Sequence, residues 1–205
     1  MKRYAFIDVQ NTETTTLKVL KFSIDYERLF VYLKDRWKCE KVFFYPGIHY
    51  GDSVRDELFK KLTKLGAIVR PKYYSIYKNE ERTVTIKCPN CYLEIKKKID
   101  TGSSWKCNCD VELTSDVIDH SLDNPDILLF SGDGDFEFLI KKITERGCTV
   151  AIISSAKKIQ KSNRYFISRL SIKLRKVTSE DGKPVRFIEI DDWKMLIKMD
   201  TLKSN

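Results

Sequence analysis

The chain has 205 residues, 42% of them hydrophobic, which excludes a disordered polypeptide and allows one full-sized domain with or without a small insertion. The net charge of +9 suits a polyanionic partner such as nucleic acid, although a solvated, lysine-rich surface would give the same charge. The sequence contains neither an apolar run of about 18 residues nor a signal-peptide core, so we expect no membrane partner and a cytoplasmic location.

Short apolar runs alternate along the chain with segments in which apolar residues recur every three or four positions. The runs predict strands and the periodic segments predict helices, whereas the threonine-rich stretch 10–16 is assigned to neither. Continuous apolar strands that alternate with helices are typical of a parallel sheet covered on both faces, so we expect an α/β fold. The expected strands are 4–7, 41–45, 67–69, 126–130, 149–153 and 186–190, and the expected helices are 25–37, 52–65, 111–122, 136–146 and 164–174.

Residues 83–109 interrupt this alternation and differ in composition from the sequence around them. We interpret them as an inserted module that divides the main domain into residues 1–82 and 110–205. The module contains two close cysteine pairs, a pattern typical of a zinc ribbon. The four thiols are Cys88, Cys91, Cys107 and Cys109.

A site with four cysteine ligands has no open position, so this zinc would be structural and not catalytic. The second pair has only one residue between its cysteines, which is tighter than usual, and two disulfides, a redox switch or an iron–sulfur cluster are the alternatives. Cys39 and Cys148 lie next to predicted strands, where we expect buried thiols.

Aspartates follow the carboxyl ends of two predicted strands. Asp8 ends the first strand, Asp133 and Asp135 follow the strand that ends at Phe130, and Asp110 opens a predicted helix. Functional groups gather at this edge of an open parallel sheet, so the three segments could deliver their acids to one place.

Each of these acids alone has a simpler explanation as a helix N-cap or a first-turn acid. A cluster of carboxylates, however, repels itself and is hard to maintain without a cation, and hard oxygen ligands suit Mg²⁺ or Mn²⁺. The stretch after Phe130 is neither a Walker loop nor a dinucleotide-binding loop, because it lacks both glycine patterns.

The acidic segments resemble, in order, the three acidic motifs of NYN domains, which are PIN-like nucleases, and most closely those of the LabA-like branch. The resemblance covers the chain outside the cysteine-rich insertion. Gly134 is the one departure in the third motif, where the family has serine, and it removes a hydroxyl but no carboxylate. The matching segments are Ile7-Asp8-Val9-Gln10-Asn11, Asp110-Val-Glu-Leu-Thr-Ser-Asp116 and Ser131-Gly-Asp-Gly-Asp-Phe136.

This resemblance implies a Rossmann-like, PIN-like sheet flanked by helices and an acidic pocket that binds divalent metal and cleaves RNA. In such chemistry Mg²⁺ or Mn²⁺ activates a water, neutralises the scissile phosphate and stabilises the leaving oxygen. No histidine base is required, so we expect His49 and His120 to be non-catalytic. By resemblance, the metal-binding acids are Asp8, Asp110, Asp133 and Asp135, Asn11 orients a ligand or phosphate, and Asp116 is a secondary acid.

The insertion interleaves lysines with aromatic residues, which suits single-stranded nucleic acid through phosphate contacts and base stacking. Its tyrosine and tryptophan could equally be the small core of the module. The candidate contacts are Lys96, Lys97, Lys98, Trp105 and Lys106.

We therefore expect a metal-dependent endoribonuclease whose zinc-ribbon insertion grips single-stranded RNA beside the active site. One alternative is a nucleic-acid-binding or regulatory module with a vestigial acidic pocket. Another is a metal-dependent phosphatase for small phosphorylated compounds, but the positive charge of the chain argues against this alternative.

Overall fold

Six parallel strands form the central sheet of the protein. The computed structural model describes residues 1–162, 165–179, 182 and 184–200. The strand order is β4–β2–β1–β10–β11–β14, so the chain begins in the middle of the sheet and the order reverses between β1 and β10. The expected α/β fold is confirmed, with the Rossmann-like order of an open parallel sheet. The strands are β1 (Arg3–Asp8), β2 (Lys41–Tyr45), β4 (Ile68–Val69), β10 (Asp126–Phe130), β11 (Thr149–Ser154) and β14 (Val185–Glu189).

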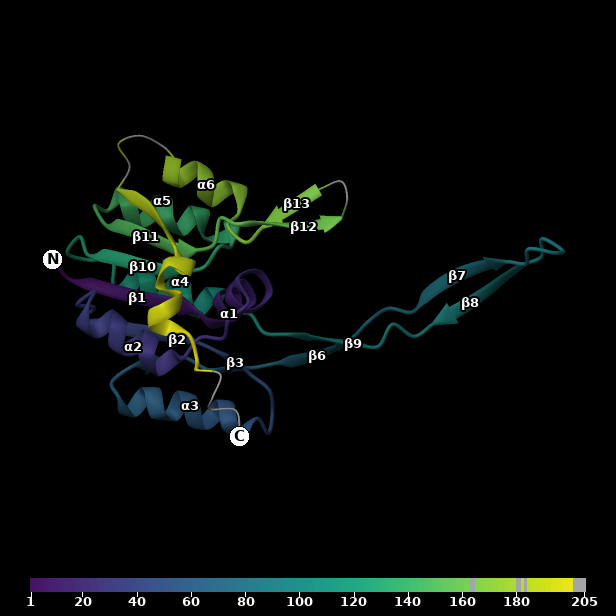
Figure 1. Cartoon of the computed structure of the whole chain (residues 1–205), viewed down its shortest axis with the longest axis horizontal. Coiled ribbons are helices and arrows are strands. Elements are labelled where there is room, and N and C mark those ends of the chain that lie inside the picture. The colour runs from purple at the N-terminus through teal and green to yellow at the C-terminus, as the bar shows by residue number, and fades with distance from the viewer. Residues whose placement is uncertain (163–164, 180–181, 183, 201–205) are drawn as a thin grey trace.

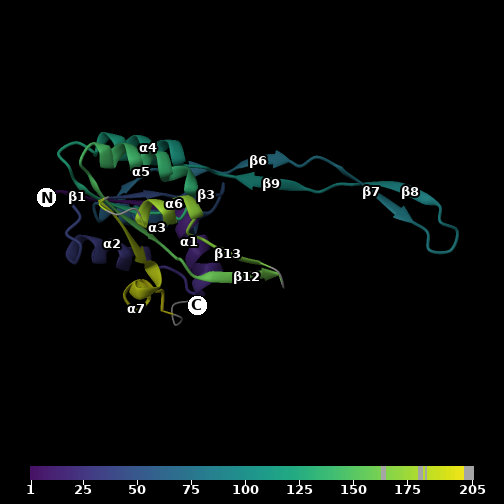
Figure 2. The ribbon, with the colours of Figure 1, turned by 90° about the horizontal axis from the view of Figure 1, so that it is seen from above.

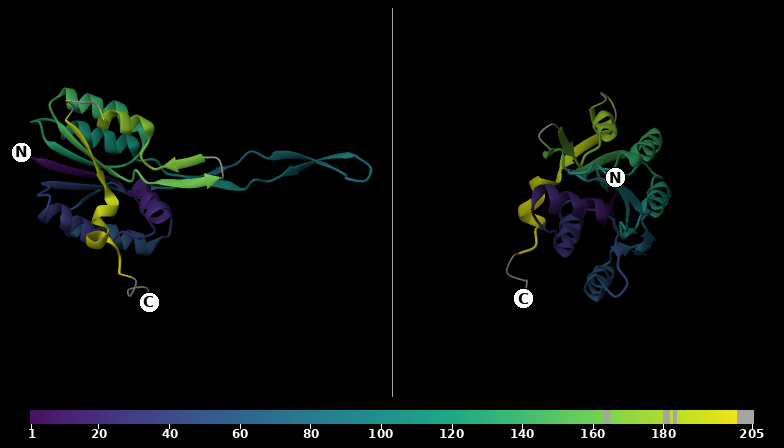
Figure 3. Two further views of the ribbon diagram at one scale, coloured as in Figure 1. Left: turned by 45° about the horizontal axis from the view of Figure 1, so that its top comes forward. Right: turned by 90° about the vertical axis from the view of Figure 1, so that its right-hand side faces the viewer.

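Helices cover both faces of this sheet (Figures 1 and 3). Successive residues of a strand point to opposite faces, so Ala5 and Ile7 belong to one hydrophobic core while Tyr4 and Phe6 belong to the other. On the first face pack α1 (Val9–Thr15), α2 (Tyr26–Asp35), α3 (Ser53–Lys64) and α7 (Lys194–Ile197). On the second face pack α4 (Asp110–Asp119), α5 (Glu137–Glu145) and α6 (Ile172–Ser179).

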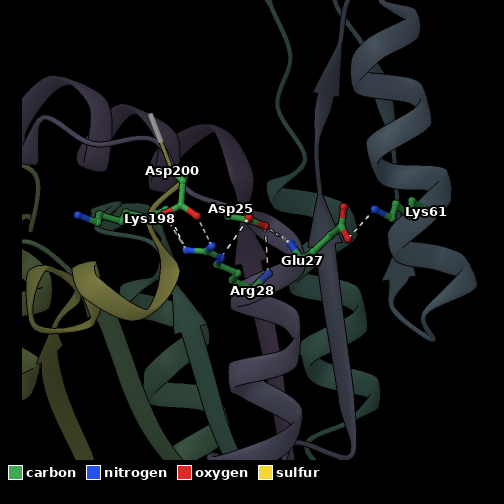
Figure 4. Close-up of polar contacts among 6 residues, drawn as sticks. All are labelled: Asp25, Glu27, Arg28, Lys61, Lys198 and Asp200. Carbon is green, nitrogen blue, oxygen red and sulfur yellow. Dashed lines mark hydrogen bonds and ion pairs between the residues drawn. The ribbon is translucent and has the colours of Figure 1, made fainter. Parts of the chain in front are cut away.

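Polar contacts fix α2 between its two neighbours on the first face (Figure 4). Asp25 caps the helix by accepting backbone hydrogen bonds from Glu27 and Arg28, each of 3.1 Å. Arg28 Nη1 donates to Asp200 Oδ1 over 3.2 Å, which holds the C-terminal segment against α2. On the other side, Lys61 of α3 forms an ion pair of 2.8 Å with Glu27.

A buried carboxylate ties four strands together at the amino edge of the sheet. The side chain of Asp126, at the start of β10, is 1% exposed. It accepts hydrogen bonds from Arg3 Nε at 2.7 Å, Thr149 Oγ1 at 2.7 Å and Arg186 Nη2 at 2.9 Å. Burial alone would raise the pKa of Asp126, but these hydrogen bonds together lower it below its usual value.

Two elements differ from the expected pattern. The threonine-rich stretch forms α1, in which the hydroxyls of Thr12, Thr14 and Thr15 donate back to carbonyl oxygens four residues earlier. The helix expected at 164–174 is wrong, because 165–168 form strand β13 (Tyr165–Ser168), paired with β12 (Lys158–Ser162), and α6 begins at Ile172. Position 164 lies outside the described residues.

The cysteine-rich insertion is a long two-stranded arm that projects from the carboxyl edge of the sheet (Figures 1 and 2). At its base β6 (Ser75–Lys78) pairs with β9 (Ser103–Lys106), and farther out β7 (Arg82–Lys87) pairs with β8 (Glu94–Ile99), both antiparallel. Every residue of β7 and β8 is exposed. The arm therefore begins before residue 83 and has the shape of a ribbon, not of a compact knuckle.

The short strands β3 (Gly47–Ile48) and β5 (Lys72–Tyr73) form a parallel pair near the base of the arm. Across the part of the chain that the structure describes, none of the helices has both the length and the apolar character needed to cross a bilayer.

Candidate functional site

A cavity of about 360 Å³ lies beyond the carboxyl ends of β1 and β10, where the strand order reverses. Ligands bind at this topological switch point in open α/β sheets. Asp8, Asp110 and Asp133 all line the cavity, together with Asn11 and Arg169. The structure thus brings together acids from three separate segments of the chain.

Asp8 is the most enclosed of these acids. One oxygen, Oδ1, accepts the Asn11 backbone N–H over 3.0 Å and so caps α1, while Oδ2 accepts the Ser131 hydroxyl over 3.1 Å. Burial raises the pKa of Asp8 to about 6, and the charges of Asp110 and Asp133 contribute in the same direction against these two hydrogen bonds. Ionisation of Asp8 in the folded protein therefore costs more free energy than ionisation of an aspartate in water.

The loop after β10 is built around Asp133. Its Oδ1 accepts the Asp135 backbone N–H over 3.1 Å, which caps the 3-10 turn η2 (Gly134–Phe136). The Asp133 backbone N–H donates to Ser131 Oγ over 3.2 Å, and the Gly132 N–H donates to Asn11 Oδ1 over 3.0 Å. These bonds join the loop after β10 to the first turn of α1 and direct Asp133 toward the cavity.

Asp110 is the first residue of α4 and follows the returning strand of the arm. Its backbone N–H donates to Asn108 Oδ1 over 2.7 Å. Partial burial raises its pKa above the usual value, and the nearby charges of Asp133 and Asp135 act in the same direction. The charges of the loop after β10 therefore act on the first residue of α4.

Neither of the other two predicted acids is among the residues that line the cavity. Asp135 is exposed and lies at its rim, close enough for its charge to act on Asp110. Asp116 faces elsewhere, because its Oδ2 accepts hydrogen bonds from Tyr45 Oη at 2.9 Å and Arg70 Nε at 3.2 Å. Tyr45 lines the cavity, so Asp116 reaches it only through that ring.

No group of three or more His, Cys, Asp or Glu side chains within the described residues is arranged to hold a metal ion between them. The carboxylates share a cavity without converging on one point. Mg²⁺ usually retains several waters and is bound by one or two carboxylates plus substrate phosphates. Such an ion needs no closed cage of protein ligands.

Arg169 is a cavity residue that sequence reasoning missed. Its Nε atom is buried and has no hydrogen-bond partner within the described part of the chain. The backbone beside it packs tightly, since a Cβ on Gly132 would lie 2.3 Å from the Arg169 carbonyl oxygen. A single arginine after an irregular hairpin carries no motif, so the sequence gives no signal for it.

The structure does not bring the four cysteines together. Cys88 and Cys91 lie in the turn between β7 and β8, at the tip of the arm, whereas Cys107 and Cys109 lie at its base and line the cavity. The six residues of β7 alone span about 20 Å at roughly 3.3 Å per residue. Since a zinc ion needs all four sulfurs at about 2.3 Å, the expected single four-cysteine site is not formed in this structure.

The remaining cysteines and the two histidines lie away from the cavity lining. Cys39 and Cys148 are buried, as expected. His49 stacks on Tyr74 at 4.1 Å between ring centroids, and His120 packs among aromatic rings of the second core.

The candidate nucleic-acid contacts are distributed along the arm. Lys96 and Lys98 alternate with Lys97 along β8, so they lie on the opposite face of the ribbon from it. Nearer the base, Trp105 is 51% exposed and meets His49 edge to face at 5.0 Å. Lys106 Nζ lies 5.4 Å from the centroid of the Tyr77 ring.

The family model described as "NYN domain" matches residues 3–172, which include β1, β10 and the acidic segments of the cavity. The chain belongs to the NYN domain family. The matched region also includes the arm. Membership places the protein among the PIN-like nucleases.

A solved structure has the same fold as this NYN domain protein. A protein of unknown function from Vibrio parahaemolyticus RIMD 2210633 superposes with a TM-score of 0.61 and 22% sequence identity, over 93% of each chain. At this identity the likeness concerns the fold alone. No curated protein matches the sequence.

Proposed function

We propose that this NYN domain protein is a divalent-metal-dependent ribonuclease that hydrolyses phosphodiester bonds in single-stranded RNA. The observation that carries the proposal is the meeting of Asp8, Asp110 and Asp133, from three separate segments, in one cavity at the switch point of the sheet. Charge repulsion among these acids would be relieved by a cation, which gives the cluster a chemical purpose that helix capping alone does not.

The donor set fits a hard divalent cation. Carboxylate oxygens suit Mg²⁺ or Mn²⁺, and the burial that raises the pKa of Asp8 makes its ionised form a group that a cation would stabilise. One or two of Asp8, Asp110 and Asp133 would hold such an ion directly and the remainder through water, and Asp135 at the rim would contact it through water or hold a second one. When bound, the metal would activate a water and neutralise the scissile phosphate.

The other cavity residues would bind and orient the substrate. Asn11 uses Oδ1 to accept the Gly132 N–H, which leaves its Nδ2 group as a donor for a phosphate oxygen. Arg169 adds a guanidinium group whose Nε has no protein partner within the described residues, and guanidinium suits phosphate. Asp116 would act as a positioning residue by fixing the Tyr45 ring through its hydroxyl.

RNA is favoured over a small phosphorylated substrate by the arm and the charge of the chain. Lys96, Lys98 and Lys106 would contact backbone phosphates, and the half-exposed Trp105 near the base would stack on an unpaired base. Lys97 lies on the other face and would reach the bound RNA only around the edge of the ribbon. The net charge of +9 supports the same choice.

A second candidate is a nucleic-acid-binding module without catalysis, favoured by the absence, within the described residues, of a closed three-ligand metal cluster. The purified protein should be incubated with labelled single-stranded RNA, single-stranded DNA and a small phosphomonoester, each with Mn²⁺ or EDTA. We expect RNA cleavage with Mn²⁺ and none with EDTA. Binding without cleavage would favour the second candidate, and turnover of the phosphomonoester alone would favour a phosphatase.

A further inference from the structure

The tip of the arm carries two free thiols, which equal half of the ligand set of a tetrahedral four-cysteine zinc site. Cys88 and Cys91 both lie in the turn between β7 and β8, separated in the chain by Pro89 and Asn90. The turn is closed by hydrogen bonds of 2.9 Å from the Tyr92 N–H to the Cys88 carbonyl and from the Cys88 N–H to the Leu93 carbonyl. Two cysteines separated by two residues are a spacing from which structural zinc sites take a pair of ligands.

This half-site cannot be completed within one chain in the described structure. The other close cysteine pair lies at the base of the arm, where Cys107 Sγ contacts the Lys72 carbonyl at 3.5 Å. No third Cys, His, Asp or Glu within the described residues joins Cys88 and Cys91 to form a metal-binding group. A tetrahedral zinc ion therefore needs two further ligands from outside the chain.

The ribbon just below the tip has an apolar face that also lacks a partner. Directly paired residues share one face, so the register of β7 and β8 places Ile86 beside Ile95, with Val84 and Ile99 farther down the same side. Ile86 and Ile95 are 52% and 55% exposed. An isolated two-stranded ribbon is at best marginally stable in water, so a covering surface would stabilise this arm.

The opposite face of the ribbon is basic and polar. It carries Thr83, Thr85, Lys87, Lys96 and Lys98, together with one acid, Glu94, which forms an ion pair of 3.9 Å with Lys87. Lys97 and Arg82 lie on the apolar side, where their aliphatic stems can cover neighbouring isoleucines while their charges reach water. The ribbon is thus amphipathic, and its apolar side extends toward the half-site.

We propose that two copies of this chain join at the tips of their arms around one Zn²⁺ ion, with Cys88 and Cys91 of each copy as its four ligands. A second copy is the occupant that supplies the missing ligands, because a two-fold axis through the metal brings the same two thiolates from the other side. The same axis brings the two apolar faces together and leaves the basic faces outward, where they remain open to RNA.

Four thiolates around Zn²⁺ carry a net charge of −2. Each arm places Lys87 directly before Cys88, where its charge is paired with Glu94 at 3.9 Å. The arm projects well beyond the body of the protein, so two tips can meet without a clash between the domains (Figures 1 and 2). The inference concerns the arm and does not depend on nuclease activity.

Zinc content and molecular mass of the full chain test this proposal. We expect one zinc per two chains, a dimer by light scattering in the presence of zinc, and a monomer after chelation of the wild-type protein. Co²⁺ in place of zinc should give the spectrum of a tetrahedral four-thiolate site. One zinc per monomeric chain, or a monomer that binds no zinc, would overturn the proposal.

Two pairs of variants localise the contact. Cys88→Ser with Cys91→Ser should remove zinc and dimerisation, whereas Cys107→Ser with Cys109→Ser should retain both; loss of zinc in both double variants would instead indicate one site within the chain. Ile95→Lys, on the apolar face, should weaken dimerisation at least about tenfold, and Thr85→Lys, on the basic face, should leave it unchanged. Equal effects of these two lysines would contradict the assigned interface.

Discussion

The hydroxyl group of Ser131 donates a hydrogen bond of 3.1 Å to Oδ2 of Asp8 and thereby joins the carboxyl ends of β10 and β1. The Oγ atom of Ser131 also accepts a hydrogen bond of 3.2 Å from the Asp133 backbone N–H. One buried hydroxyl thus positions two of the cavity acids at the place where the strand order reverses.

In the metal-free protein, Asp8 should make stability fall as the pH rises from about 4 to about 6. Its pKa is raised from the ordinary 3.8 to about 6, so in this range the folded state holds a proton that the unfolded chain has released. The contribution is present at low pH and lost above the folded-state pKa. Asp8→Asn does not titrate and should be more stable than the wild type near pH 7, by about 1–2 kcal/mol.

Urea unfolding of both proteins in EDTA, at several pH values across this window, measures the effect. The difference between the two proteins isolates Asp8 from the other carboxyl groups. A difference that does not change with pH would show that Asp8 has an ordinary pKa.

Gly132 and Gly134 should respond differently to the same substitution. A Cβ at Gly132 would lie 2.3 Å from the Arg169 carbonyl oxygen and 2.6 Å from Ser154 Oγ, and the backbone cannot move away easily. At Gly134 the nearest atom is Ser171 Oγ at 3.0 Å, which is part of a side chain. Gly132→Ala should cost about 2–3 kcal/mol, whereas Gly134→Ala should change stability by less than about 1 kcal/mol in either direction.

Thermal or urea unfolding of the two alanine variants gives this comparison directly. Similar stabilities would mean that the loop after β10 does not pack against residue 169 as described. Gly134→Ser, which restores the serine of the family motif, should resemble Gly134→Ala.

Loss of the Asp126 carboxylate should be among the most destabilising single changes at the amino edge of the sheet. Arg3 and Arg186 would keep their charges without this common partner, but their side chains are 28% and 44% exposed, so we expect a cost of about 2–3 kcal/mol, below the value for a fully buried ion pair. We expect this loss for Asp126→Ala in urea unfolding. Lys2→Ala breaks only the exposed ion pair with Asp123 and serves as the control, with an effect below about 1 kcal/mol.

Arg169→Ala should separate substrate binding from metal binding. Its guanidinium group shares the cavity with Asp8 and Asp133, so its removal should weaken RNA binding by about tenfold and strengthen Mn²⁺ binding. Filter binding of RNA and titration with Mn²⁺ measure the two effects. Arg36→Ala, at the exposed end of α2, should alter neither. A parallel loss of both affinities would point to general disruption of the cavity.

Much of the central domain could be predicted from the sequence because its elements bury uninterrupted apolar patterns. The strand expected at 126–130 has those bounds, and the helix expected at 52–65 is present between its N-cap Asp52 and Gly66. The helix α1 gave no such signal, because its first turn depends on the Asp8 cap and on threonine hydroxyls bonded to the helix backbone. Local hydrogen bonds of this kind leave no apolar period in the sequence.

The site was predictable to the extent that acids follow strand ends. The topology of the sheet brings Asp8, Asp110 and Asp133 into one cavity. Asp116 instead forms hydrogen bonds with Tyr45 and Arg70, and the spacing of acids along the sequence does not predict these contacts. Cysteine spacing suggested one compact knuckle. The paired strands β7 and β8 instead separate the cysteine pair at the tip from the pair at the base. The alternation of Thr83, Val84, Thr85 and Ile86 in the sequence indicated strand β7.

The most direct test of the proposed function is the rate of Mn²⁺-dependent cleavage of labelled single-stranded RNA by Asp133→Asn. Asparagine can still accept the Asp135 N–H through its own Oδ1, so the cap of η2 and the fold should persist while the negative charge is lost. Asp119→Asn, the same change at an exposed position at the end of α4, is the matched control. We predict that Asp133→Asn lowers cleavage by at least about a hundredfold with unchanged unfolding and that Asp119→Asn cleaves like the wild type; full activity of a folded Asp133→Asn protein would contradict the account.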